Sequence, residues 1–91
     1  MTRFEWDVTK ARTNVRVHSV SFDEAKTVFA GTLGVTVPDV VHSEDEERWT
    51  TIGLSDRKRL LVVVHSERGG NIRLISARKA TAAERRQYEE D

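Results

Sequence analysis

One segment of the sequence carries five apolar residues in a row, LLVVV at positions 60–64, between Arg59 and Glu67. A strand with one face in water alternates apolar and polar side chains, whereas a run without alternation predicts a strand that is buried on both faces. Such a strand lies inside its sheet, with a neighbour on each side. We therefore expect residues 59–67 to form the central strand of a sheet.

Residues 4–7, which read FEWD, predict the start of a first helix. Asp7 is the expected N-cap, and Trp6 before it packs the start of the chain onto the core. The helix runs to about Val17. Its expected apolar stripe consists of Val8, Ala11 and Val15.

Two further helices are predicted by capping boxes, in which a Ser or Thr is followed three residues later by Glu. One of these helices begins at Ser21 and ends at Gly31 or Gly34, because glycine commonly ends a helix. The other begins at Thr81 and runs toward the C-terminus.

The rest of the chain predicts strands and turns. Pro38 cannot donate to a sheet ladder, so its segment is an edge strand or irregular, and Gly69-Gly70 marks a hairpin turn. In chain order we expect an edge strand or irregular extended segment at 36–42, a strand at 46–54, a turn at 55–58, the central strand at 59–67 and a strand at 71–78.

This order of elements predicts a single α+β domain over residues 1–91. It has two N-terminal helices, a three- to four-stranded, mainly antiparallel sheet and a C-terminal helix, and the helices pack against one face of the sheet. A chain of 91 residues with 37% hydrophobic content can build one core and no second domain.

Composition excludes several classes of site. The chain has no cysteine, and its three histidines, His18, His42 and His65, are too scattered for a metal-ligand motif, so we expect no metal and no cofactor. No stretch approaches the roughly 20 apolar residues that span a bilayer. Residues 1–10 are charged and lack the apolar centre of a signal peptide. We expect a cytoplasmic protein without a membrane contact.

The net charge is zero, but the charges are unevenly distributed. Positions 57–86 hold nine Lys or Arg and two acids, Glu67 and Glu84, a net charge of +7, whereas positions 39–47 hold five acids and no basic residue. Eleven of the fifteen basic residues are Arg, which makes bidentate contacts with phosphate. The basic stretch fits a phosphate-binding surface, and a solvated surface explains it equally well.

Several short motifs, in this order, resemble the BrnT toxin family over almost the whole chain. They are FEWD at 4–7, Lys10, Asn14, His18, SFDEA at 21–25, ERW at 47–49, IG at 52–53, RLISARKAT at 73–81, Glu84-Arg85 and Tyr88. The block at 73–81 is the most specific of them.

The resemblance implies a RelE-like fold and a ribonuclease toxin that blocks growth by degrading RNA. It also implies a partner, a DNA-binding BrnA antitoxin that neutralises the toxin and associates with it as a dimer of heterodimers. Two positions depart from the family pattern. Val17-His18-Ser19 stands where the family usually reads Lys-His-Gly, so the phosphate contact of that lysine is in doubt, and His65 stands where an aromatic residue is common.

Metal-free RNA cleavage needs a base for the 2′-hydroxyl proton, cations for the charge that develops on the phosphate, and an acid for the leaving 5′-oxygen. Arg73 and Arg78, which flank one strand, and Arg48 on a neighbouring strand are the expected charge stabilisers. An alternative role for Arg78 is a structural ion pair with Glu84.

The expected base is Glu67 or His18. The alternative for Glu67 is a surface acid at the end of the hairpin, and for His18 a helix C-terminal residue that bonds free carbonyl groups. Expected RNA contacts are Ser76, Lys79 and Arg59; alternatively, Ser76 fills a tight position in the sheet.

Three further side chains have a structural interpretation. We expect His65 to pack at the end of its apolar strand and Trp6 to lie in the core, whereas Trp49 either lies in the core or stacks on bases.

Three functions compete at this point. The first is a metal-independent endoribonuclease toxin. The second is a BrnT-like binding module that lost activity with the family lysine and holds only an antitoxin or RNA. The third, a DNA-binding autoregulator, lacks a helix-turn-helix pattern.

Overall fold

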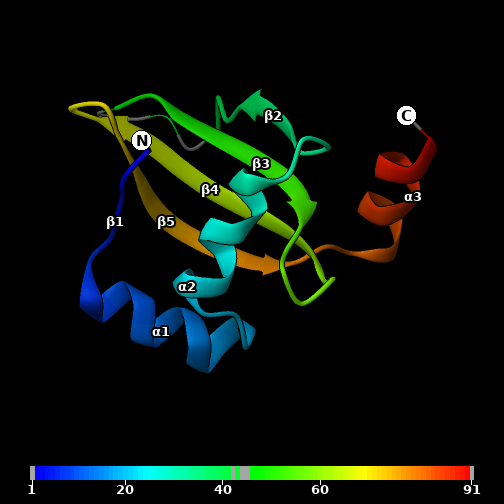
Figure 1. The fold of residues 1–91 in the computed structure, drawn as a ribbon, viewed down its shortest axis with the longest axis horizontal. Helices are drawn as coiled ribbons and strands as arrows, with labels where there is room; N and C mark the ends of the chain where they lie inside the picture. The colour runs from blue at the N-terminus through cyan, green and yellow to red at the C-terminus, as the bar shows by residue number, and fades with distance from the viewer. Residues whose placement is uncertain (1, 42, 44–45, 91) are drawn as a thin grey trace.

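The computed structural model describes residues 2–41, 43 and 46–90 of the chain. Its elements, shown in Figure 1, are β1 (Phe4–Glu5), α1 (Val8–His18), α2 (Phe22–Ala25), the 3₁₀ helix η1 (Lys26–Ala30), β2 (Val35–Pro38), β3 (Arg48–Leu54), β4 (Leu60–Arg68), β5 (Asn71–Lys79) and α3 (Ala82–Glu90). This is an α+β fold, as expected.

The strands form one mixed sheet in the order β1-β5-β4-β3-β2. Only β1 and β5 run parallel, and the other neighbours are antiparallel, so the expected antiparallel character is confirmed. The expected number of strands is wrong, because the sheet has five strands and not three to four. β4 lies between β3 and β5, as its apolar run predicts, and Val63 within it is fully buried.

The unexpected strand is β1, which occupies the residues expected to open the first helix. Phe4 and Glu5 pair in parallel with Ile72 and Arg73, and the Ile72 amide donates to the Arg3 carbonyl at 2.9 Å. A strand of two residues is too short to show the alternation by which strands are recognised. Its partner, 68 residues later in the chain, decides its conformation.

The other edge of the sheet and the hairpin agree with the sequence. β2 is an edge strand that ends at Pro38, and His42, the last residue of the expected segment, lies outside the described residues. Gly69 and Gly70 join β4 to β5 with φ angles of 58° and 84°. Left-handed backbone of this kind favours glycine, which explains the hairpin at this position.

Helix α1 begins as expected but buries a different face. Asp7 Oδ2 accepts a hydrogen bond from the Lys10 amide at 2.9 Å. The expected apolar stripe is wrong for Val8 and Val15, which are 59% and 48% exposed, whereas Ala11 packs against the core. The buried residue of α1 is Asn14, whose side chain bonds β5, so a polar contact with the sheet sets the rotation of the helix.

The second helical segment caps as predicted. Ser21 Oγ accepts a hydrogen bond from the Glu24 amide at 3.0 Å, and α2 continues into η1, which ends at Ala30 with Gly31 as its C-cap. The core lies between these helices and the sheet. Its buried members are Val20, Phe22, Ala25, Val28, Leu61, Val63, Leu74 and Ala77.

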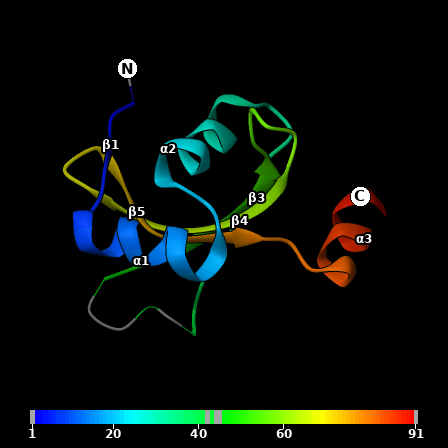
Figure 2. The ribbon, with the colours of Figure 1, turned by 90° about the horizontal axis from the view of Figure 1, so that it is seen from below.

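The helices do not all lie on one side. Figure 2 shows α2 on one side of the curved sheet and α3 beyond the end of β5, whereas α1 overlaps the sheet in this view and contacts β5 through Asn14. The expectation that every helix packs against one face is wrong for α3, which buries no residue. Its apolar residues are too few for a core-facing stripe, and Tyr88 reaches the Leu33 carbonyl at 3.0 Å. Among the described residues, no helix is long and apolar enough to cross a membrane.

Candidate active site

The face of the sheet opposite α2 and η1, here called the open face, carries four polar side chains in one row. In the sheet register Glu5 lies opposite Arg73, Arg73 opposite Ser66, and Ser66 opposite Arg48. Directly opposed residues share a face, with Cβ atoms about 4.5–5.5 Å apart in antiparallel pairs. These four residues, which span β1, β5, β4 and β3, are called the arginine row.

The packing of neighbouring residues places this row on the open face. Ile72 and Leu74 pack in the core, so Arg73 between them points the other way. On β3, a Cβ added to Gly53 would lie 2.9 Å from the Val28 side chain, so position 53 faces the helices. Position 48 lies an odd number of residues away on the same strand and therefore faces the open side.

Arg73 is held within the row by an ion pair. Its Nη1 donates to Glu5 Oε2 at 2.9 Å, and Asn71 Nδ2 donates to Glu5 Oε1 at 3.3 Å. The side chains of Arg73 and Glu5 are 26% and 31% exposed. Because a guanidinium has five N–H donors, this contact orients Arg73 and leaves donors for a bound anion.

The middle of the row contains two buried polar atoms, Arg48 Nε and Ser66 Oγ, that have no hydrogen-bond partner among the described residues. Arg48 lies on β3, two strands from Arg73, with β4 between them. The two arginines therefore flank Ser66, and the expectation that Arg48 lies on a strand next to that of Arg73 is wrong. The row brings together Arg48 and Arg73 of the predicted charge stabilisers.

Arg78, the third predicted charge stabiliser, lies elsewhere on the open face and is paired. Its Nη1 and Nη2 donate to the two carboxylate oxygens of Glu84 at 2.8 and 2.9 Å. The Arg78 guanidinium holds the pKa of Glu84 down to about 2, and Glu84 raises the pKa of Arg78. The pairing with Glu84 proposed as an alternative is thus present in the structure.

Arg59 has a structural environment on the helix side of the sheet. Its Nε donates to Glu24 Oε2 at 2.9 Å and its Nη2 to the Ser19 carbonyl at 3.1 Å. Ser55 Oγ donates to the same Glu24 oxygen at 2.7 Å. The hydrogen bond from Arg59 holds the pKa of Glu24 below its ordinary value. This network joins α2 to the start of β4 and lies apart from the arginine row.

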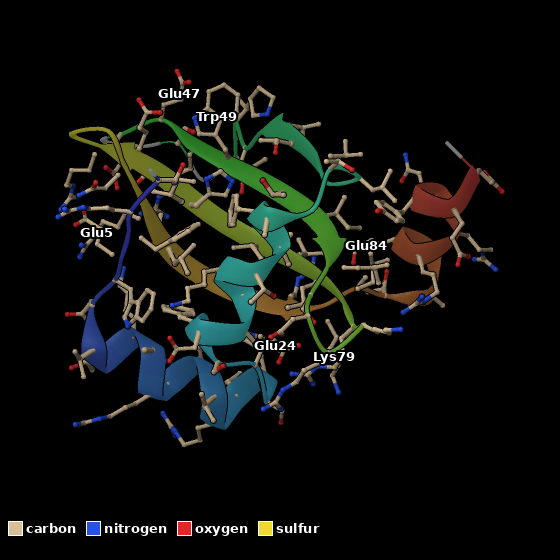
Figure 3. All side chains as sticks on the ribbon, viewed as in Figure 1. Glu5, Glu24, Glu47, Trp49, Lys79 and Glu84 are labelled. Atoms are coloured by element: carbon tan, nitrogen blue, oxygen red, sulfur yellow. The ribbon has the colours of Figure 1, made fainter. Side chains whose placement is uncertain are left out.

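Glu67 and Lys79 do not join the arginine row either. Glu67 lines a cavity of about 370 Å³ with Trp49, Glu46 and Glu47 at the end of the sheet. It follows Ser66 on β4 and so points to the opposite face. Lys79 lies opposite the core residue Leu61 in the register, at the far end of β5; Figure 3 shows Glu47 and Trp49 at the other end of the sheet from Lys79.

His18 and Ser76 share a different cavity, of about 360 Å³, between α1 and β5. Val17, where the resemblance leads one to expect a lysine, lines the same cavity and is 60% exposed. A lysine at that position would bring a charge to this cavity, so the departure seen in the sequence changes its chemistry. Lys10, from the first turn of α1, also lines this cavity.

His65 lies in the core, as expected. It is 7% exposed, its ring packs edge-on against Phe29 at a centroid distance of 4.9 Å, and its Nε2 is 2.7 Å from Thr51 Oγ1. Burial lowers the pKa of His65 to about 4. Trp6 also packs against the core, edge-on to Phe22, and Trp49 is half-buried.

The basic stretch at 57–86 does not form one uniform surface. Four of its arginines are paired with acids: Arg59 with Glu24, Arg68 with Glu46, Arg73 with Glu5 and Arg78 with Glu84. Arg59 lies on the helix side of the sheet, whereas Arg73 and Arg78 lie on the open face. Of the arginine row, Arg73 alone belongs to this stretch.

Two members of the row, Glu5 and Ser66, are absent from the residues that sequence reasoning selected. Glu5 belongs to the FEWD motif, which is the signal that could have found it. For Ser66 no local signal exists, because its neighbours Arg48 and Arg73 are set by the register of three strands. Among the described residues, no group of three or more acidic or histidine side chains is placed to hold a metal ion.

Comparison with known proteins agrees with this architecture. No curated protein sequence matches the chain. Among solved structures, it resembles the Brucella abortus ribonuclease toxin BrnT, determined at 1.1 Å, with a TM-score of 0.70 and 20% sequence identity over 89% of this chain and 99% of that one. At this identity the likeness shows the fold alone.

The family evidence comes from the sequence. Residues 6–84 match the model of the BrnT family, described as the ribonuclease toxin of a type II toxin–antitoxin system. This segment includes β3, β4, β5 and all of α1. The chain therefore belongs to the BrnT family of ribonuclease toxins.

Proposed function

We propose that this chain cleaves RNA endonucleolytically at the arginine row, without a metal ion, and that a BrnA-like antitoxin neutralises it. The observation that carries the proposal is the placement of Arg48 and Arg73 on either side of Ser66, on the open face of the sheet. Fixed guanidinium groups stabilise charge that develops on a phosphate. The family membership supports RNA cleavage as the reaction, and the arginine row supports this face of the sheet as the place where it occurs.

In the proposed reaction the RNA 2′-hydroxyl oxygen attacks phosphorus and gives its proton to a base. The bond from phosphorus to the 5′-oxygen then breaks, and the 5′-oxygen takes a proton from water. The products are a 2′,3′-cyclic phosphate and a 5′-hydroxyl. Arg48 and Arg73 stabilise the charge on the oxygens of the pentacoordinate intermediate. The proposed reaction therefore needs no metal ion for this task.

Glu5 is the carboxylate that the row itself contains, and we assign it the role of base. Its ion pair fixes its carboxylate beside the guanidinium of Arg73, one of the two proposed charge stabilisers. Glu67 points to the opposite face, and His18 lies with Ser76 in the cavity beside α1. Those residues, with Lys79, remain proposed contacts for more distant parts of the RNA. Arg78 stays a proposed site residue if RNA displaces Glu84 from it.

The partner is the second part of the proposal. A toxin of a type II system implies an antitoxin, and we take it to be a DNA-binding, BrnA-like protein in a dimer of heterodimers. The open face offers it an apolar cavity of about 320 Å³ between the sheet and α3, lined by Val35, Val37, Thr50, Ile52, Val62, Glu84, Gln87 and Tyr88. The RelE-like classification and a cytoplasmic location belong to the same proposal.

One observation favours the competing function, a binding module without activity. Val17 leaves the cavity beside α1 without the lysine usual at that place. If that lysine is needed for cleavage, the chain binds RNA or antitoxin only. Replacing Val17 by Lys would then create a nuclease from an inactive protein.

The deciding experiment uses purified full-length chain and a 5′-labelled RNA, with product ends identified by phosphatase and kinase treatment. We expect cleavage that leaves 2′,3′-cyclic phosphate ends, loss of cleavage with Glu5→Gln, and retained cleavage with Glu67→Gln and His18→Gln. Products that carry a 5′-phosphate would contradict the proposed reaction. RNA that stays intact with the natural chain and is cut by Val17→Lys would establish the competing function.

A further inference from the structure

The geometry points to a phosphate-binding pocket in which Ser66 Oγ and Arg48 Nε donate to one phosphate oxygen, with Arg73 on the other side of it. The inference rests on the proposed function in one respect: we take the bound phosphate to belong to the RNA backbone. It adds Ser66, a residue that neither the family motifs nor charge patterns single out.

The first observation is that two buried polar atoms lack partners at the same place. Ser66 is 1% exposed, and neither its Oγ nor Arg48 Nε makes a hydrogen bond to any described residue. Nearly all buried polar groups in native proteins are paired. Among the described residues these are the two buried side-chain atoms left without a partner. Both of them can donate a hydrogen bond.

The second observation is that the strands bring these atoms to neighbouring positions. Ser66 and Arg48 are directly opposed on β4 and β3, on the same face of the sheet. Their Cβ atoms are therefore about 4.5–5.5 Å apart, a separation at which one acceptor oxygen can lie between the two side chains. A phosphate oxygen has the lone pairs to accept from both donors at once.

The third observation concerns charge. Arg73 lies opposite Ser66 on the other side, so the hydroxyl has a guanidinium in each neighbouring strand. The carboxylate of the row, Glu5, bonds Arg73 from the far side of β5 and not Ser66. An arginine on each neighbouring strand and two unpartnered donors favour an anion over a neutral ligand or a second carboxylate.

A comparison with Ser55 shows why a structural role does not explain Ser66. Ser55 is 6% exposed, and its Oγ donates to Glu24 at 2.7 Å and accepts from the Arg57 amide at 3.2 Å. Its hydroxyl therefore stabilises the fold. The hydroxyl of Ser66 makes no such bond among the described residues, so its removal takes nothing from the protein's own contacts.

The test combines NMR with two matched serine variants. In ¹⁵N-labelled full-length protein, the Arg48 Nε–Hε signal is followed during titration with inorganic phosphate and, separately, with an RNA oligonucleotide in which 2′-deoxy sugars block cleavage. We expect the signal to shift with both probes, and more strongly with the oligonucleotide if the RNA backbone is the natural source of phosphate. A shift with inorganic phosphate alone would assign the pocket to a free phosphate.

The variants separate binding from folding. Ser66→Ala should weaken binding of the oligonucleotide by about tenfold or more, since one hydrogen bond to a charged group is lost, and leave the melting temperature unchanged or raised. Ser66→Thr, which keeps a hydroxyl, should recover part of the affinity. Ser55→Ala should lower the melting temperature and leave affinity unchanged.

Two results overturn the pocket: an Arg48 Nε–Hε signal that does not move with either probe, or Ser66→Ala protein that binds the oligonucleotide like the natural chain. Either result leaves RNA cleavage by the natural chain as a separate question. Conversely, phosphate binding in a chain that never cleaves RNA would keep the pocket and reject the proposed enzymatic function.

Discussion

Arg78 and Glu84 form an ion pair with two hydrogen bonds, 2.8 and 2.9 Å long, that joins the end of β5 to the first turn of α3. Glu84 also completes a capping box, because its Oε1 accepts from the Thr81 amide at 2.9 Å and its own amide donates to Thr81 Oγ1 at 3.1 Å. α3 buries no residue, so these polar contacts and the Tyr88 hydrogen bond are what position it.

We predict that Glu84→Ala loosens α3 more than Arg78→Ala does. The first variant loses both the ion pair and the capping box, about 1–2 kcal/mol together, whereas the second loses only a half-exposed ion pair, about 1 kcal/mol or less. Hydrogen exchange of the α3 amides measures this, because a helix without buried residues opens locally. Equal loss of protection in both variants would mean that the capping box adds nothing to the ion pair, and protection as in the natural chain in both would mean that neither contact holds α3. If Arg78→Ala keeps α3 protected and still abolishes RNA cleavage, Arg78 belongs to the active site.

Removing an arginine from the row should nearly abolish cleavage without unfolding the protein. We expect Arg48→Ala and Arg73→Ala each to lower the rate of RNA cleavage on the order of 10²–10³-fold, since each removes a fixed donor from the phosphate. Arg57→Ala and Lys58→Ala are the controls, because these exposed side chains in the turn between β3 and β4 act only through salt-screened attraction. Full cleavage activity in folded Arg48→Ala and Arg73→Ala proteins would remove the row from the mechanism.

Stability should fall in mild acid because of His65. Its pKa is lowered from 6.5 to about 4 in the folded state by burial, so the unfolded chain binds its proton first as the pH falls. The stabilisation from the neutral ring is thus complete above about pH 6.5 and is lost between there and about pH 4. Urea unfolding midpoints across this range measure it. His65→Phe should flatten the profile and His18→Gln should not; an unchanged slope in His65→Phe protein would assign the effect to other groups.

Asn14 should be the most sensitive position of α1. Its Nδ2 donates to the carbonyls of Val20 and Ala77 at 2.8 Å each, and its Oδ1 accepts from the Ala77 amide at 3.0 Å. Asn14→Ala leaves three buried backbone groups without partners, which should cost on the order of 3 kcal/mol in the free energy of unfolding. Val17→Ala on the exposed side is the control and should change it by less than about 0.5 kcal/mol. Urea denaturation that gives equal values for the two variants would contradict this role.

Cleavage should proceed in excess chelator. The proposed charge stabilisers are arginines, so treatment with EDTA should leave the rate and the 2′,3′-cyclic phosphate ends unchanged. Activity that disappears in EDTA and returns with Mg²⁺ would replace this mechanism by a metal-assisted one.

Features that depend on neighbouring residues in the chain could be read from the sequence. The caps at Asp7 and Ser21, the Gly69-Gly70 hairpin and the central position of β4 are all found in the structure. In each case a local rule decides the result: a side chain reaches an amide three residues later, glycine accepts a positive φ, or a run of apolar residues must leave water.

Other features depend on contacts between distant parts of the chain. β1 forms because it pairs with β5. Asn14 of α1 is buried because its side-chain amide bonds backbone groups of Val20 and Ala77, and this rotation of the helix leaves Val8 and Val15 exposed. Neither effect has a periodic signal near the residue concerned.

The candidate site shows the same division. The sequence by itself determined that arginines are concentrated in the second half of the chain and that the family motifs contain Arg48, Arg73 and Arg78. Only the tertiary structure decided that Arg48 and Arg73 flank Ser66, whereas Arg78 pairs with Glu84 and Glu67 faces the other way. The physical reason is register: a shift of one residue between two strands moves every side chain to the opposite face, and the long-range pairing of whole strands sets that register.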